Sequence, residues 1–402
     1  MARDRLGERA VSVVRDVWSA VTPLGRAVGL AGVVSWVLAA SFGWAEMAML
    51  AAGLLLSLLV GVASLLFGNV KLNVLLDLAT PRVVVGDMAS STVVATNDSV
   101  RRMLPVRLEA RVGRGVAQLE VPSLASGASH DEVFLIPTNR RSVVPVGPVR
   151  SVQGDPLGLV RREHLWTGTE NLFVHPRTVQ VPPVTTGWMR DLEGMTTNDR
   201  SPSDVAFHTL REYVVGDDRR HIHWRTTARQ ADGKMMVREF VDTRRAHLGL
   251  VLSLRAEDYA SDEEFELAVS ALASIGQRAL RDEQDLTVLA GIRPLPSFHG
   301  ASFMDALAGL KLGSDPTPLA GIAAQGRDHL RAVSLAVVVS GSGSDPSQVR
   351  IATQRLGPAV RSVGLTANVG SATGLLPAPQ GAHIELGALE YLPSVLTRVT
   401  VS

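Results

Sequence analysis

The sequence predicts a membrane-anchored chain that combines an all-β domain with an α/β domain. A long apolar region near the N-terminus carries a single charged residue, Glu46. Short alternating strands follow it, and then fully apolar runs alternate with helical patterns. We therefore expect a two-helix transmembrane hairpin within residues 1–70, a small β-sandwich over 71–185, a linker with a dense polar motif over 186–245, and a doubly wound α/β domain over 246–402.

The predicted hairpin depends on two apolar stretches, residues 27–45 and 47–70, that contain no ionisable side chain. Each reaches the roughly 20 residues needed to cross about 30 Å of hydrocarbon. Gly43, Trp44 and Glu46 would form the turn between them. A cleaved signal peptide does not fit, because the apolar region starts late, runs too long and is followed at once by a second one.

Basic residues predict the orientation. They precede the first span and follow the second: Arg3, Arg5, Arg9, Arg15, Arg26, Lys71 and Arg82. Positive charge favours the cytoplasmic side, so we expect both ends of the hairpin, and the soluble remainder, in the cytoplasm of a two-span cell-membrane protein. The net charge of +1 gives no global bias toward nucleic acid, and the absence of cysteine excludes disulfides and thiolate metal sites.

Short apolar runs separated by turn residues predict the β-sandwich: 82–85, 92–95, 106–112, 132–136 and 172–175. Strict alternation in 106–112 indicates one buried and one wet face. Pro176, Pro182, Pro183 and Gly187 then break any regular ladder and indicate a linker that runs to about residue 203.

The α/β domain is predicted from buried-strand and helix patterns in alternation. The strands are expected at 248–254, 286–292, 333–339 and 362–369, and the helices at 263–280 and 345–356. Ligands of such sheets gather where strands end, at Ser253 and Ser340 here. Glu257 and Asp258 are interpreted as helix-start charges. The glycine-rich turn at 341–344 could cradle a phosphate, but it lacks a following lysine and is interpreted as a flexible turn. We predict no metal and no cofactor.

The densest chemistry lies in residues 210–239. His221 and His223 would point the same way on a strand and could share a metal with Asp217 or Asp218, although structural histidines are commoner. Arginines beside Trp224 could instead bind phosphates and a base. Paired charges are favoured, with Arg211 and Arg220 holding Glu212 and Asp217 through bidentate contacts and Trp224 filling an interdomain core.

This segment resembles the signature of the domain-of-unknown-function 58 family. The matching positions are Arg211, Glu212, Tyr213, Gly216, Asp217, Arg220, Ile222, His223, Trp224, Ala228, Arg229 and Glu239. The likeness extends to residues 140–141, 146–148, 155–159, 174–176 and 389–393. It implies that the α/β domain is similar to a von Willebrand factor A domain and that the protein works beside a MoxR-type AAA ATPase. Such domains often bind metal through Asp-x-Ser-x-Ser, but Ser253 and Arg255 occupy those positions here.

Three functional hypotheses remain open. The leading one is a non-enzymatic membrane adaptor that docks the ATPase through residues 211–239. The alternative is a hydrolase or nucleotide-dependent enzyme that uses Asp217, His223 and Arg229 around a pocket. In the third, the motif only cements the two soluble domains together.

Overall fold

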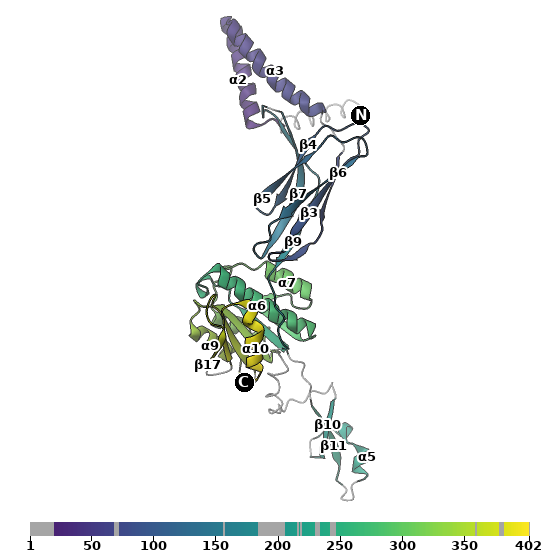
Figure 1. Cartoon of the computed structure of the whole chain (residues 1–402), viewed down its shortest axis with the longest axis vertical. Coiled ribbons are helices and arrows are strands. Elements are labelled where there is room, and N and C mark those ends of the chain that lie inside the picture. Colours follow the sequence, from purple (N-terminus) through teal and green to yellow (C-terminus); the bar gives the residue numbers. More distant parts are fainter. Residues whose placement is uncertain are drawn as a thin grey trace. The chain divides into compact units, whose positions relative to one another are not determined.

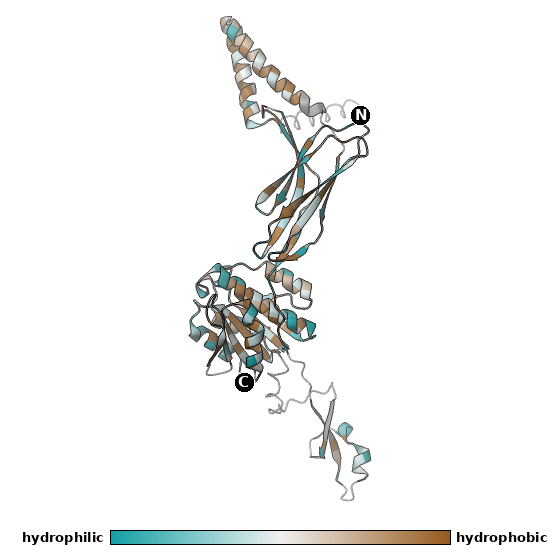
Figure 2. Cartoon of the chain, viewed as in Figure 1, coloured by the Kyte–Doolittle hydropathy of each residue, from teal (hydrophilic) through white to brown (hydrophobic). Residues whose placement is uncertain are grey.

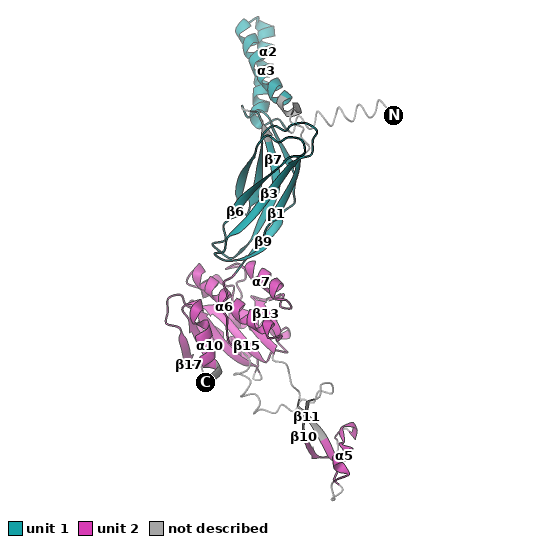
Figure 3. Ribbon diagram, turned by 45° about the vertical axis from the view of Figure 1, so that its right-hand side comes forward, with its two compact units in different colours: residues 1–175 teal, residues 176–402 magenta. Residues whose placement is uncertain are grey.

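The computed structural model describes residues 20–67, 72–155, 157–183, 206–214, 217, 219–229, 234–241, 247–357, 360–377 and 382–401. The chain divides into two compact units, Met1–His175 and Pro176–Ser402 (Figure 3). Most of the predicted linker, residues 184–205, lies outside the described residues. Figure 1 gives the order of the elements.

The first unit begins with two long apolar helices, α2 (Pro23–Phe42) and α3 (Ala45–Phe67), joined at Gly43 and Trp44. Both are long and apolar enough to span a membrane, and little of either is buried within the chain. Figure 2 shows hydrophobic residues along both. The predicted pair of apolar helices is therefore confirmed, and the chain has two candidate membrane spans near its N-terminus.

Two β-sheets follow in the same unit. The first has the strand order β1 (Leu72–Leu78), β3 (Ala89–Asn97), β6 (Ser129–Ile136). The second has the order β2 (Arg82–Val84), β9 (Glu170–His175), β7 (Ser142–Gly154), β4 (Val106–Val112), β5 (Gly115–Val121), with β8 (Arg161–Leu165) paired to β7. Val93 and Phe134 of the first sheet share one hydrophobic core with Leu108 and Leu172 of the second. The alternation predicted for β4 is confirmed, because Val106, Leu108 and Ala110 are buried and Arg107 is exposed.

The second unit contains a seven-stranded sheet whose five inner strands are parallel and whose two edge strands are antiparallel. Its order is β14 (Arg293–Leu295), β13 (Asp285–Ala290), β12 (His247–Leu252), β15 (Leu335–Gly341), β16 (Arg361–Ala367), β18 (Ala382–Leu386), β17 (Gly374–Pro377). The four predicted parallel strands all belong to it. Successive strands are added in opposite directions from β12, so the order reverses between β12 and β15.

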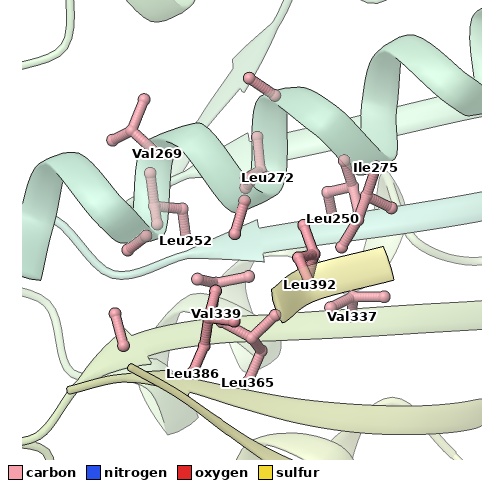
Figure 4. Close-up of a cluster of buried hydrophobic side chains, with 14 of the residues drawn as sticks. Leu250, Leu252, Val269, Leu272, Ile275, Val337, Val339, Leu365, Leu386 and Leu392 are labelled. Atoms are coloured by element: carbon pink, nitrogen blue, oxygen red, sulfur yellow. The ribbon is translucent and has the colours of Figure 1, made fainter. Parts of the chain in front are cut away.

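Helices cover both faces of this sheet. One face packs against α6 (Asp262–Arg281), α7 (Gly300–Ala308) and α10 (Leu392–Val401), and the other against α8 (Leu319–Gln325) and α9 (Pro346–Arg355). Side chains alternate along a strand, so Leu250 faces the first group and Val251 the second. Figure 4 shows Leu250, Leu272 and Leu392 in the hydrophobic core between the sheet and the first group of helices. Three short 3-10 turns complete the domain: η2 (Ala256–Asp258), η3 (Gly326–Asp328) and η4 (Leu389–Tyr391).

The segment after the β-sheets belongs with the α/β domain. Val181 is buried in the α6 core, the Val179 N–H donates to Ser274 Oγ at 3.0 Å, and an Arg278 N–H donates to the Val181 carbonyl at 3.3 Å. The chain therefore divides after His175 rather than after residue 185. The prolines remove backbone donors, but the segment stays packed against the α/β domain because Val179 and Val181 bury apolar surface there.

Candidate interaction site

Residues 206–241 form a small element of their own, which we call the two-stranded module. Its strands are β10 (Ala206–Glu212) and β11 (Met236–Val241), and η1 (Arg219–His221) and α5 (Trp224–Thr227) lie between them in the chain. Ile222 forms an isolated bridge with Val237, and both side chains are buried. The sequence placed this motif in a linker; the structure pairs its two ends across an antiparallel sheet.

An ion pair between Arg211 and Asp217 stabilises the turn that follows β10. The two guanidinium nitrogens of Arg211 donate to the two carboxylate oxygens of Asp217, each at 2.7 Å. Asp217 also accepts from the Val214 N–H at 2.9 Å, and its own N–H donates to the Val214 carbonyl at 3.0 Å. Its side chain is only 7% exposed. A bidentate, largely desolvated pair of this kind fixes geometry as well as energy.

The predicted bidentate arginine contact thus exists at Asp217, whereas the expected arginine contact at Glu212 is wrong. Glu212 pairs with Lys234 at 3.1 Å, and both side chains are exposed. Adjacent strand residues point to opposite faces, so the Arg211 side chain cannot share the direction of Glu212. The Arg211 side chain instead contacts Asp217, because the turn after β10 places Asp217 on the same face as Arg211. Arg211 does donate to the backbone carbonyl of Glu212 at 3.1 Å.

The two histidines do not lie together on a strand, so that expectation is also wrong. His221 ends η1, and His223 is the N-cap of α5. The His223 Nδ1 atom accepts from the Thr226 N–H at 3.3 Å and lies 2.6 Å from the Thr226 hydroxyl oxygen. Its backbone N–H donates to the Met236 carbonyl at 2.8 Å, which ties α5 to β11. Within the described residues, no group of three or more His, Asp or Glu could hold a metal ion.

Apolar side chains of the module face solvent. Trp224 is 65% exposed and Val214 is 63% exposed, and Met235 is also exposed. Trp224 is therefore not packed into a core within the module, and its place in an interdomain core stays a prediction. Backbone hydrogen bonds hold the neighbours of these residues together in space. The Tyr213 N–H donates to the Met235 carbonyl, and the His223 N–H donates to the Met236 carbonyl. Val214 directly follows Tyr213 and Trp224 directly follows His223, so both lie next to residues that are hydrogen-bonded to Met235 or Met236.

Exposed cations surround this apolar group in the sequence. Arg219, Arg225 and Arg229 are exposed, and so is Arg220. Gly216, Asp218 and the side chain of Glu239, all in the predicted motif, lie outside the described residues. The described part of the module therefore combines a tied-down ion pair with exposed aliphatic, aromatic and cationic groups.

The second predicted place, at the ends of β12 and β15, is filled by the chain's own side chains. The Ser253 hydroxyl donates to Asp258 at 2.5 Å, and the Ser342 hydroxyl donates to Glu264 at 2.7 Å. Tyr259 lies between Asp258 and Glu264 in the sequence, and its hydroxyl donates to the Ser253 carbonyl at 2.8 Å. Its pKa is raised well above its usual value, chiefly by burial and then by the carboxylates of Asp258 and Glu264.

Glu257 and Asp258 are acidic residues in the first turn of the 3-10 helix η2, as the sequence predicts, but Asp258 also has a structural role. It is buried and accepts a hydrogen bond from Ser253, and α6 begins four residues later at Asp262. The glycine-rich turn packs tightly onto this segment, since a Cβ at Gly341 or Gly343 would overlap the backbone of residues 257–259. Two backbone N–H groups of this turn already have acceptors, because the Ser342 N–H donates to Glu264 at 3.2 Å and the Ser344 N–H donates to the Gly341 carbonyl at 3.2 Å.

Comparisons with solved structures give low similarity. A CARDB domain from Pyrococcus furiosus in complex with di-metal ions has a TM-score of 0.22 at 14% identity and covers 27% of this chain and 96% of its own. A beta-glucosidase from Listeria innocua has a TM-score of 0.19 at 8% identity, over 26% of this chain and 16% of its own. A sporulation control protein from Bacillus subtilis has a TM-score of 0.16 at 13% identity, over 31% and 55%. No curated protein matches the chain in sequence.

The family comparison covers the region just described. It begins within β10, includes the two-stranded module and extends to β15, the central strand of the α/β sheet. The resemblance predicted from the sequence is therefore confirmed: residues 209–340 match the family described as "Protein of unknown function DUF58".

Proposed function

We propose that this chain is a membrane-anchored, non-enzymatic adaptor that docks a MoxR-type AAA ATPase through its two-stranded module. The observation that carries the proposal is the Arg211–Asp217 pair, which fixes a turn beside exposed apolar groups. A rigid presentation lowers the conformational entropy lost on binding. The module thus has the composition of a recognition surface on a preorganised frame.

Two of the groups that the enzyme alternative uses are already engaged, Asp217 at both carboxylate oxygens and His223 at one ring nitrogen. Asp217 gives both carboxylate oxygens to Arg211, and His223 gives its Nδ1 atom to Thr226. A general base must instead be within hydrogen-bond reach of a substrate proton. Arg229 is exposed, and among the described residues no hydrogen bond or ion pair joins it to Asp217 or His223. We therefore favour docking over catalysis for these residues.

The exposed side chains suggest the chemistry of the partner surface. Tryptophan and arginine are enriched among residues that dominate binding energy at protein interfaces. Trp224 would enter an apolar recess on the ATPase, while Arg219 and Arg225 would meet acidic groups at its rim. The same cations would accelerate encounter and make it sensitive to salt.

The proposed location follows from the helices and the charges. The apolar pair α2 and α3 spans the cell membrane, and the arginine-rich start of the chain keeps the soluble units in the cytoplasm, where ATP is available to the partner. We further propose that the two sheets of the first unit form a β-sandwich and that the α/β domain is von Willebrand factor A-like. The filled strand ends at Ser253 and Ser342 support docking without a bound metal.

Affinity capture tests the proposal. The tagged full chain, solubilised in detergent from its native membrane, is expected to retain the ATPase, and the double variant Arg211→Ala, Asp217→Ala is expected to lose most of it. Lys234→Ala is the matched control, because it removes an exposed ion pair of the same module. Unchanged capture by the double variant would contradict the docking role. Loss of soluble, folded protein in that variant alone would support the role of structural cement.

A further inference from the structure

Within the first unit, a loop that joins two strands contacts the start of α2 and the end of α3. We call residues 155 and 157–160, between β7 and β8, the base loop. The Thr22 N–H donates to the Leu159 carbonyl at 3.0 Å, the Thr22 hydroxyl donates to the Gly158 carbonyl at 2.7 Å, and Val21 bridges Val160. Thr22 is the N-cap of α2, so the loop is fastened to the start of the first candidate span.

Two glycines show how far the base loop reaches along the helices. A Cβ at Gly25 would overlap the Leu159 carbonyl. A Cβ at Gly61 would lie 3.4 Å from Val160 and 3.6 Å from the Asp155 carboxyl carbon. Gly25 lies in the first turn of α2, and Gly61 lies in the last two turns of α3, which ends at Phe67. The base loop therefore lies beside the ends of the two candidate spans that are away from the turn at Gly43.

The base loop has an internally fixed shape. Asp155 accepts from the Leu157 N–H at 3.1 Å and from the Val160 N–H at 2.7 Å. Its carboxylate is thus satisfied inside the turn. Leu159 and Val160 are buried, and Val160 packs with Leu58 and Val62 of α3, yet Leu157 at the tip is 62% exposed. An exposed leucine on a fixed turn beside two apolar helices is suited to burial at a lipid interface.

Basic side chains lie next to the base loop. Arg161 and Arg162 directly follow Val160 and are exposed, and Arg26 lies one turn after Thr22 on α2. Arg161 also pairs with Glu163 at 2.9 Å, and both remain partly exposed. Guanidinium groups beside a membrane surface are attracted to anionic headgroups.

We propose that the base loop is a lipid-contact surface for an anionic bilayer. Leu157 inserts at the boundary between headgroups and acyl chains, and Arg26, Arg161 and Arg162 bind lipid phosphates. The β-sheet unit is thereby held against the membrane by more than its covalent link to the helices. The base loop is a different surface from the two-stranded module, and its contact with lipid does not depend on the ATPase.

Depth-dependent fluorescence quenching tests the proposal in the full chain, reconstituted in nanodiscs of phosphatidylcholine and phosphatidylserine. The chain contains no cysteine, so Leu157→Cys carries a single bimane label. We expect lipids with a nitroxide near the top of the acyl chain to quench this probe. Leu165→Cys is the matched control, because Leu165 is 64% exposed but lies four residues along β8 from Arg161, roughly 13 Å away.

The outcomes separate the parts of the proposal. Val37→Cys, in the middle of α2, should be quenched by a nitroxide deep in the bilayer; if it is not, the premise of a spanning helix fails and the proposal with it. Quenching at Leu157 no greater than at Leu165 would overturn the lipid contact. With Arg161→Gln and Arg162→Gln, quenching at Leu157 should lose its dependence on phosphatidylserine. Persistence of that dependence would overturn the role of these arginines.

Discussion

The α/β domain and the two-stranded module belong to the same unit but are stabilised in opposite ways. The domain buries two apolar clusters on the faces of a seven-stranded sheet, whereas Ile222 and Val237 are the buried apolar residues among those of the module whose side chains the structure describes. The described side chains of the module are held by an ion pair, by a histidine cap and by a hydrogen bond that the Met236 N–H donates to the Thr227 hydroxyl. Local polar bonds allow large side chains such as Trp224 to stay outside, which a recognition surface requires.

The largest expected effect comes from the domain core. Leu250→Ala removes a fully buried side chain between α6 and the sheet and should lower the free energy of unfolding by about 2–5 kcal/mol. Urea unfolding in detergent, followed by circular dichroism, measures it. Leu376→Ala on the exposed part of β17 is the control and should change stability by less than about 0.5 kcal/mol. Equal shifts for the two variants would disprove the assigned core.

The reciprocal change acts on the module. Asp217→Asn removes the charge that Arg211 binds and should raise amide hydrogen exchange at Val214 about 10- to 100-fold, corresponding to about 1–3 kcal/mol. Exchange in β12 and β15 should not change, because their protection depends on the apolar clusters. Lys234→Ala, which breaks an exposed pair, should raise exchange less than about fivefold. A global loss of protection after Asp217→Asn would show that the two regions are not separately stabilised.

Two serines at the ends of neighbouring strands sharpen the comparison within the domain. Both are fully buried, but Ser253 donates to Asp258 while the Ser340 hydroxyl has no hydrogen-bond partner among the described residues. Ser253→Ala should cost about 1–3 kcal/mol because it leaves a buried carboxylate unsatisfied. Ser340→Ala should be neutral or slightly stabilising. Equal costs in the same denaturation assay would refute the proposed network around Asp258.

The smallest effect is a pH dependence confined to the domain. Burial lowers the pKa of His383 and of His247 below 6.5, against the opposing influence of Glu385 and Asp285. Below pH 6.5 the unfolded chain binds a proton that the folded chain resists, so stability is retained above that pH and lost as the pH falls through it. His383→Asn should flatten this slope in thermal melts. An increase in melting temperature on acidification from pH 7 would contradict the burial of these imidazoles.

Regular apolar patterns were predictable from sequence. Helices were expected at 263–280 and 345–356, and α6 and α9 occupy Asp262–Arg281 and Pro346–Arg355. These elements are determined by local periodicity and by caps such as Ser261 and Asp345, whose side chains accept from the backbone N–H groups of Glu264 and Ser347. The paired apolar helices were predictable for the same reason.

The polar site was predictable in composition but not in geometry. The sequence indicated that residues 211–239 carry the specific chemistry, and that an arginine would bind Asp217. It did not reveal the antiparallel pairing of Glu212 with Met236, because the register of two strands separated by 23 residues depends on tertiary contacts. Without that pairing, the exposure of Trp224 and the true partner of Arg211 could not be derived. The hydrogen bond from Ser253 to Asp258 could not be derived either, because it depends on how the loop after β12 folds.

The docking role of the two-stranded module is tested most directly by the affinity of the purified ATPase for the full chain in nanodiscs, measured by interferometry with the Trp224→Ala variant. We expect the dissociation constant to rise at least about 30-fold, since a central tryptophan contributes roughly 2 kcal/mol or more. Phe298→Ala, which removes a highly exposed aromatic ring of the α/β domain, should leave it unchanged. An unchanged affinity for Trp224→Ala would contradict the account.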